Sequence, residues 1–103
     1  MYQITVTYGV PADPEAFDRY YRDTHLPLAS QIPNLQSLTG GRCYSADGQP
    51  IGAYLVTTLT FDSEEVAVSS MATPQGVAAA QDIANFATGG ASIVYTDVAY
   101  RLP

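Results

Sequence analysis

The chain has 103 residues, of which 47% are hydrophobic and 14% are charged, and its ten acidic and four basic residues give a net charge of −6. This composition fits one small globular domain over residues 1–103 and excludes a disordered chain. The four basic residues, all arginines, do not cluster, so we expect neither nucleic acid nor an anionic membrane as a partner.

The first residues do not form the basic segment and following apolar segment of a signal peptide, so we expect no signal peptide. No apolar run approaches about 20 residues, so we expect no membrane span. A cytoplasmic location is the default expectation. The single cysteine, Cys43, excludes an intramolecular disulfide, and it fits a small core residue better than a reactive thiol.

The first half of the chain predicts a strand and then a helix. Residues 2–10 alternate between apolar side chains and Gln or Thr, which is typical of a half-buried strand. A helix follows from an N-cap at Asp13 to about His25, close to a proline that we expect to end it. Within it, Phe17, Tyr21 and His25 recur every four residues and define the stripe that faces the sheet.

The second half predicts three strands and a divided helix. Residues 35–44 and 52–61 form two strands joined by a turn with an Asp-Gly pair. Two helix starts follow, one capped by Asp62 and the other by Thr73, so the second helix comes in two pieces before a glycine pair ends it. Residues 91–101 form the last strand.

The order β-α-β-β-α-β predicts a ferredoxin-like α+β sandwich, in which a four-stranded antiparallel sheet carries both helices on one face. The other face should be polar if it meets water, but the positions available for it carry no charge. Two explanations stay open: a homodimer packed sheet against sheet, which the low charged fraction favours, or an unusually apolar but solvated face. The positions are Thr5, Thr7, Tyr54, Val56, Thr58, Val94, Thr96, Val98 and Tyr100.

His25 is the only histidine, and it lies on the stripe that should face the sheet. There it would present a group that titrates near neutral pH to an enclosed space, as a general acid or base requires. The alternative is structural: the ring bonds a nearby carbonyl or complements the negative end of the helix dipole. P-loop, dinucleotide-binding, C-x-x-C and H-E-x-x-H motifs are absent, so we expect no cofactor and no metal.

The chain holds eight tyrosines and no tryptophan. These tyrosines fit either amphipathic filling of the core, with hydroxyls at the surface, or the aromatic walls of a ligand pocket. Tyr8, on the apolar side of the first strand, and Tyr21, on the helix stripe, are the candidates for a pocket.

The motif F-x-x-Y-Y-x-x-x-H-x-P-L at residues 17–28, followed by IPNL and much later by ANFATGG, resembles the EthD family, named for its association with ethyl tert-butyl ether degradation. The resemblance spans nearly the whole chain as one EthD-like domain, residues 1–103. It implies a dimeric α+β barrel in which two monomers pair through their sheets, and a cleft near His25. Relatives in the wider superfamily include muconolactone-type isomerases, cofactor-free monooxygenases and polyketide-cyclase-like proteins. The label "reductase" is attached to the family, but this sequence contains no nucleotide-binding motif that would support it.

Three functional hypotheses follow. The favoured one is a cofactor-independent enzyme of catabolism or secondary metabolism, in which His25 moves a proton on a small carbonyl-containing or phenolic metabolite. Tyr8, Tyr21, Phe17 and Phe86 would contact that substrate. The alternatives are a non-catalytic small-molecule-binding or accessory dimer and a housekeeping dimer, with His25 structural in both. The enzyme is favoured because a titratable group on the core-facing stripe costs stability that packing alone does not require.

Overall fold

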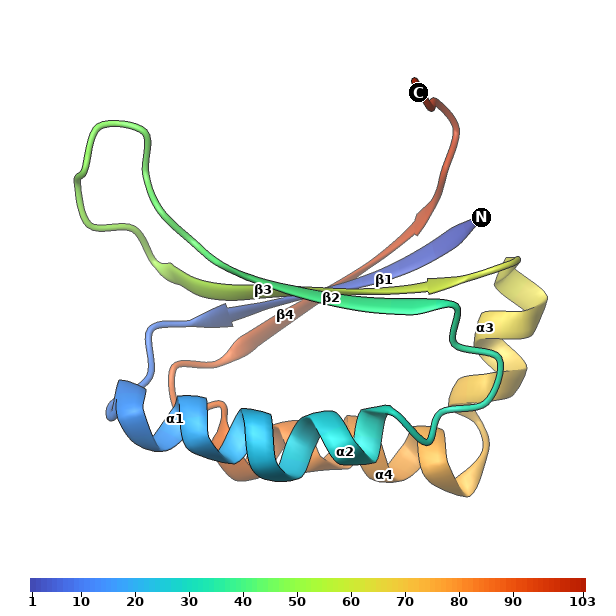
Figure 1. Ribbon diagram of the computed structural model, residues 1–103, viewed down its shortest axis with the longest axis horizontal. Helices are drawn as coiled ribbons and strands as arrows, with labels where there is room; N and C mark the ends of the chain where they lie inside the picture. The colour runs from blue at the N-terminus through green and yellow to red at the C-terminus, as the bar shows by residue number, and fades with distance from the viewer.

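The computed structural model describes residues 1–103 and contains one four-stranded sheet with a layer of helices on one face (Figure 1). All strand pairings are antiparallel, in the order β2-β3-β1-β4. This confirms the predicted ferredoxin-like α+β sandwich, including the second helix in two pieces. The elements are β1 (Tyr2–Gly9), α1 (Pro14–Tyr20), the π-helical turn η1 (Tyr21–His25), α2 (Leu26–Ala29), β2 (Ser37–Arg42), β3 (Ala53–Phe61), α3 (Glu64–Met71), α4 (Pro74–Phe86) and β4 (Ala91–Asp97).

Side-chain caps fix where three of the helices begin. Asp13, Ser63 and Thr73 each accept a hydrogen bond from the backbone N–H three residues further on, which satisfies a donor that the helix leaves free. The caps of α1 and α4 are those expected from the sequence, but the predicted cap of α3 was wrong by one residue. The Asp62 carboxylate instead accepts a hydrogen bond from the side-chain amide of Gln36.

The first helix runs to Ala29, beyond its predicted end near His25, because α1, η1 and α2 follow one another without a break. In η1 the backbone turn widens, and the N–H of Leu26 bonds the carbonyl of Tyr21 five residues earlier. In a regular α-helix the ring of Pro27 would collide with the carbonyl four residues before it, and the wider turn accommodates it. His25 therefore lies inside a helix rather than at its end.

The helix-covered face of the sheet carries the core. Ile4, Val6 and Tyr8 of β1 are buried there, as their alternation predicted. The buried side chains form a largely aliphatic cluster, which includes Ile4, Leu59 and the ring of Phe61, and a largely aromatic second cluster. The aromatic cluster comprises Val6, Tyr8, Phe17, Tyr21, Tyr54 and Phe86.

The opposite face of the sheet, called the open face below, carries no charged side chain. Directly paired residues share a face, and the register aligns Thr5 with Thr58 and Val94 across three strands. Tyr54 differs from the expectation, because a bulge at the end of β1 leaves its ring on the helix side, where the hydroxyl donates to Asp18 of α1 at 2.8 Å. By register the open face comprises Gln3, Thr5, Thr7, Ser37, Thr39, Gly41, Val56, Thr58, Thr60, Ser92, Val94 and Thr96.

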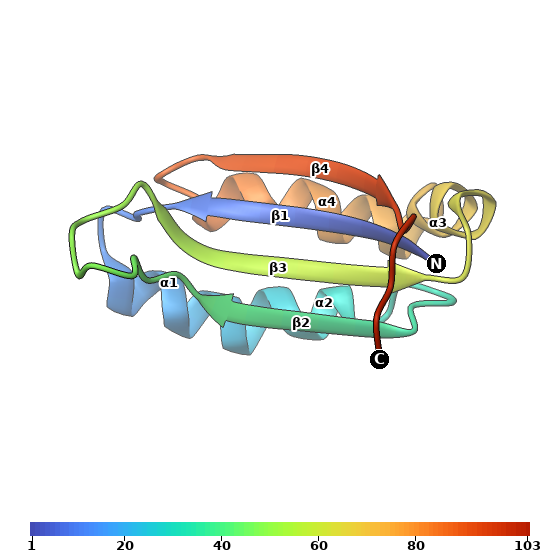
Figure 2. The same ribbon diagram turned by 90° about the horizontal axis from the view of Figure 1, so that it is seen from above.

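Two segments rise from the sheet on the side away from the helices, namely the β2–β3 connection and the residues after β4 (Figure 1). From above, the four strands lie side by side over the helices, and the C-terminal segment crosses their ends (Figure 2). None of the helices has the length and apolar character needed to cross a membrane.

Candidate functional site

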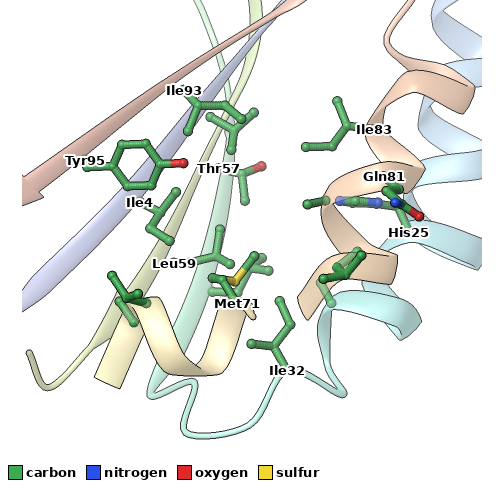
Figure 3. A pocket seen from close by; sticks show the side chains of 18 of the residues that line it. Ile4, His25, Ile32, Thr57, Leu59, Met71, Gln81, Ile83, Ile93 and Tyr95 are labelled. Atoms are coloured by element: carbon green, nitrogen blue, oxygen red, sulfur yellow. The ribbon is translucent and has the colours of Figure 1, made fainter. Parts of the chain in front are cut away.

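A cavity of about 650 Å³ lies between the sheet and the helices, and 18 of its 21 lining residues are hydrophobic. Ile93 and Tyr95 of β4 lie on one side of it, and His25, Gln81 and Ile83 from the helix layer lie across from them (Figure 3). No Asp, Glu, Lys or Arg side chain lines the cavity. No group of three or more His, Cys, Asp or Glu side chains is arranged to hold a metal ion. This size and lining suit a small, largely apolar organic molecule.

His25 is the one titratable nitrogen base on the cavity wall, and it is only 6% exposed. Its Nδ1 lies 3.0 Å from Oδ2 of Asp82, and its ring packs against Phe86 and Tyr21 with centroid distances of 4.7 and 5.4 Å. Its Nε2 has no hydrogen-bond partner in the protein. Every side-chain nitrogen or oxygen that is sealed from solvent does have a partner. Nε2 therefore reaches accessible space, and the space that His25 lines is the cavity.

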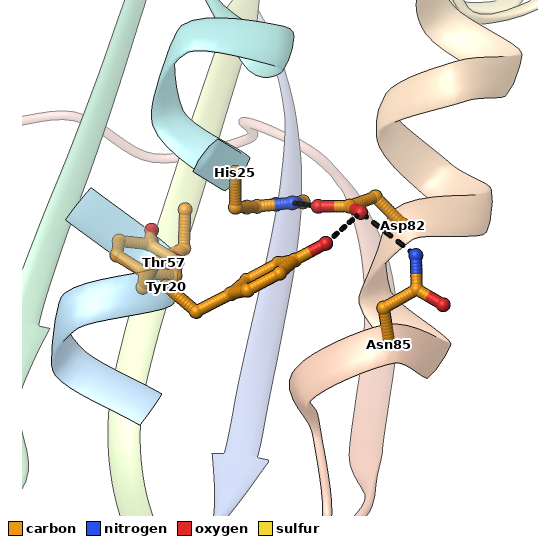
Figure 4. A network of polar contacts seen from close by, with 6 residues as sticks. Tyr20, His25, Thr57, Asp82 and Asn85 are labelled. Carbon is orange, nitrogen blue, oxygen red and sulfur yellow. Dashed lines mark hydrogen bonds and ion pairs between the residues drawn. The ribbon is translucent and has the colours of Figure 1, made fainter. Parts of the chain in front are cut away.

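Asp82 of α4 is the centre of a polar network behind His25 (Figure 4). Its Oδ1 accepts hydrogen bonds from the Tyr20 hydroxyl at 2.7 Å and from Asn85 Nδ2 at 3.0 Å. Burial opposes ionisation of Asp82, but the hydrogen bonds from Tyr20, Asn85 and His25 outweigh it and lower the pKa of this carboxyl.

The ionised state of Asp82 fixes the hydrogen on His25. A carboxylate can only accept, so His25 must donate from Nδ1. In the neutral ring, Nε2 then carries the free lone pair on the cavity side. This arrangement, a buried carboxylate that orients an imidazole, is the one that equips a histidine for general acid–base chemistry.

Tyr8 supplies a second polar group to the cavity, and it is 1% exposed. Its hydroxyl has no hydrogen-bond partner in the protein, so by the same reasoning it reaches accessible space. Burial, with smaller contributions from Tyr21 and Asp82, raises the pKa of Tyr8 far above its usual value. The hydroxyl stays protonated and can donate to a bound molecule. The Tyr21 hydroxyl is instead paired with Thr57 Oγ1 at 2.6 Å.

The structure divides the five site residues expected from the sequence. His25 and Tyr8 line the cavity, whereas Phe17, Tyr21 and Phe86 do not. These three belong to the aromatic cluster beside it, in which Phe17 stacks on Tyr21 and Phe86 meets Phe17 edge to face. They hold the rings of His25 and Tyr8 in place instead of forming the walls expected for them.

Sequence reasoning missed Asp82, although the sequence holds a signal for it. Asp82 lies three residues after Ala79 and four before Phe86, so it occupies the buried stripe of α4, where a carboxylate needs partners. Tyr20 and Asn85, which donate to it, were also missed as site residues. The side chain of Asn85 is held by its bond to Asp82.

The EthD domain family matches residues 11–90, and the chain belongs to this family. An uncharacterized 11.0 kDa protein in the thcB-thcC intergenic region of Rhodococcus erythropolis is 45% identical over 103 residues, covering 100% of both chains. The crystal structure of an EthD family protein from Bacillus halodurans has a TM-score of 0.90 at 27% identity and covers 96% of this chain and 99% of that one.

Two more distant structures share the fold alone. SnoaB, a cofactor-independent oxygenase from Streptomyces nogalater, has a TM-score of 0.70 at 15% identity, covering 99% of this chain and 96% of that one. A dimeric protein of unknown function with a ferredoxin-like fold, from Bacteroides fragilis, has a TM-score of 0.66 at 13% identity, covering 94% and 95%. The fold is therefore one that both a cofactor-independent enzyme and a dimer of unknown function use.

Proposed function

We propose that this protein is a cofactor-independent enzyme that transfers a proton on a small, largely apolar carbonyl or phenolic compound, with His25 as the general base and acid. One observation carries the proposal. The sole histidine is buried on the wall of an apolar cavity, with Nδ1 held by Asp82 and Nε2 left without a protein partner.

The chemistry follows from the positions of the groups. Nε2 of His25 takes a proton from a hydroxyl or from a carbon next to a carbonyl, which leaves a phenolate or enolate in the cavity. The imidazolium that forms is stabilised by the Asp82 carboxylate, and the Tyr8 hydroxyl donates a hydrogen bond to the anionic oxygen. Return of the proton to a different carbon completes an isomerisation. One positioned base contributes about 10²–10⁴-fold to the rate.

We also propose that the protein works as a homodimer through the open face. A face of some twelve register-aligned positions without a charge is unusual for a sheet that meets water on one side. A second copy of the same face would cover it with a self-complementary surface of threonine, serine and valine.

The proton-transfer proposal is tested by deuterium exchange. β-Tetralone is an uncharged bicyclic ketone with acidic protons next to its carbonyl, and proton NMR in D₂O follows their loss. The wild type should accelerate exchange about 10²-fold or more over buffer, and His25→Gln should return it to the buffer rate. Arg22→Gln, an exposed change in the same helical turn, should behave as the wild type.

If the ketone binds, as shown by line broadening, but the wild type does not accelerate its exchange, the proton-transfer proposal is wrong. The binding-protein alternative would then account for the cavity. If His25→Gln exchanges as fast as the wild type, His25 is not the base.

A further inference from the structure

The large apolar side chains that line the cavity and are also exposed to solvent come from three neighbouring elements. Val68 of α3, Val77 of α4, and Ile93 and Tyr95 of β4 all line it and are all between 41% and 62% exposed. β4 is an edge strand of the sheet. These four side chains therefore form a rim, called the mouth below, between β4 and the α3–α4 pair. Large exposed apolar residues gathered around a cavity mark a binding surface more often than a surface without function.

Acidic groups lie beside this mouth. Asp97 is paired with Tyr2 across β1 and β4, so it shares the face of Tyr2, which lines the cavity. Glu64, in the first turn of α3, lies four residues before the rim residue Val68 and so on the same face of the helix. Burial raises the pKa of the Tyr2 hydroxyl most, and the nearby Glu64, Tyr95 and Asp97 raise it further. None of the four arginines lines the cavity, and the chain has no lysine.

An anion entering here meets two unfavourable effects. It approaches carboxylates of its own sign, and it then leaves water for a cavity that offers no cation. An uncharged apolar molecule meets neither effect and gains free energy from burial against the aliphatic walls. Figure 3 shows the Tyr95 ring at this side with its hydroxyl directed into the cavity, opposite the helix that carries His25.

We propose that the mouth is the entrance for the substrate and that it admits uncharged apolar molecules while rejecting anions, with Ile93 and Tyr95 in contact with the bound molecule. The inference rests on the proposed function only in using the same cavity, because it requires no chemistry at His25. It adds the charge class of the substrate and the side chains that select it.

Two fluorescent ligands with the same aromatic skeleton test the selection by charge. N-phenyl-1-naphthylamine is uncharged, and 8-anilino-1-naphthalenesulfonate is the corresponding sulfonate. The wild type should bind the uncharged probe at least about tenfold more tightly than the sulfonate. The double variant Glu64→Gln/Asp97→Asn should strengthen sulfonate binding about fivefold and leave binding of the uncharged probe within twofold. Glu15→Gln/Asp47→Asn makes the same charge change on α1 and in the β2–β3 connection, neither of which forms the mouth, and should alter neither.

A bulky substitution tests the position of the entrance. Ile93→Trp should weaken binding of the uncharged probe about tenfold or more. Ile51→Trp, at a residue of similar exposure in the β2–β3 connection (40% against 45%), should not change it. Equal binding of the two probes by the wild type would overturn the selection by charge. If Ile93→Trp binds the uncharged probe as tightly as the wild type, or if the wild type does not bind this probe, the mouth is not the entrance.

Probe binding to the variant His25→Gln distinguishes a failure of the entrance proposal from a failure of the proton-transfer proposal. His25→Gln keeps the mouth intact, so it should bind the uncharged probe within about threefold of the wild type even when it no longer accelerates exchange.

Discussion

The change Asp82→Asn removes the negative charge behind His25 while keeping the shape of the side chain. Asp82 accepts three hydrogen bonds, from His25, Tyr20 and Asn85. An asparagine can keep its oxygen toward Tyr20 and Asn85 only by turning its NH₂ toward His25. His25 must then accept at Nδ1 and carry its hydrogen on Nε2, so that the nitrogen on the cavity side becomes a donor and stops being a base.

The cost in stability can be estimated from these bonds. Three charge-assisted hydrogen bonds become neutral ones, and each is weaker by about 1 kcal/mol. Burying the neutral amide costs less free energy than burying the carboxylate, and this difference offsets part of the lost stability. We expect the free energy of unfolding to fall by about 1–2 kcal/mol at pH 7, which lowers Tm by about 5–10 °C in a domain of this size.

The pH dependence gives this prediction its sharpest form. The folded-state pKa of Asp82 is lowered, so its contribution is fully present above the unfolded value of about 3.9 and is lost as the pH falls through the folded pKa. Urea denaturation followed by circular dichroism should therefore show the full difference between wild type and Asp82→Asn from pH 7 to 5. The difference should shrink below about pH 4. A difference that stays constant from pH 7 to 3 would refute an ionised, hydrogen-bonded Asp82.

Three further predictions concern other parts of the molecule. Tyr8→Phe removes a hydroxyl without a protein partner, so Tm should stay within about 2 °C of the wild type while β-tetralone exchange falls about tenfold. Tyr21→Phe breaks the buried hydrogen bond to Thr57 and should lower the free energy of unfolding by about 1 kcal/mol. A Tm loss for Tyr8→Phe as large as that for Tyr21→Phe would contradict a free hydroxyl. Gly76→Ala should lower the free energy of unfolding by about 3 kcal/mol or prevent folding, because its Cβ would lie 2.5 Å from a Cα and 2.6 Å from a carbonyl oxygen of α3. Gly52→Ala, in the β2–β3 connection and with no atom within 4 Å of the new Cβ, is the control for thermal unfolding. Thr58→Lys places a charge on the open face and should halve the molar mass measured by light scattering from that of a dimer, and a wild type that already measures as a monomer would contradict the homodimer.

The fold was predictable because its signals are local. The alternation in β1 and the caps at Asp13 and Thr73 involve residues within four positions of one another, and the structure confirms them. The cap of α3 could not be settled in this way, because Asp62 and Ser63 are both good capping residues and their sequence neighbours fit either choice. The π turn was missed because the proline after His25 predicts a helix end. The continuous, locally widened helix keeps Tyr21, His25 and Ala29 buried on both sides of the proline, a tertiary effect that the local sequence does not show.

The site was predictable only in part, because it depends on contacts between distant residues. His25 and Asp82 are 57 positions apart, and nothing in either segment alone shows that they meet. The spacing of Phe17, Tyr21 and His25 correctly marks the face that points inward. It does not show which of these side chains meets a cavity and which meets the aromatic cluster, since both environments are apolar.

The most direct test of the central claim is the hydrogen on the His25 ring. His25 is the sole histidine, so long-range ¹H–¹⁵N correlation spectra of the wild type with ¹⁵N-labelled histidine report on this residue without overlap. In the neutral ring we predict a hydrogen on Nδ1 and none on Nε2. Asp82→Asn should reverse this pattern. A wild-type ring protonated on Nε2 would contradict the account, because the nitrogen on the cavity side could then not act as a base.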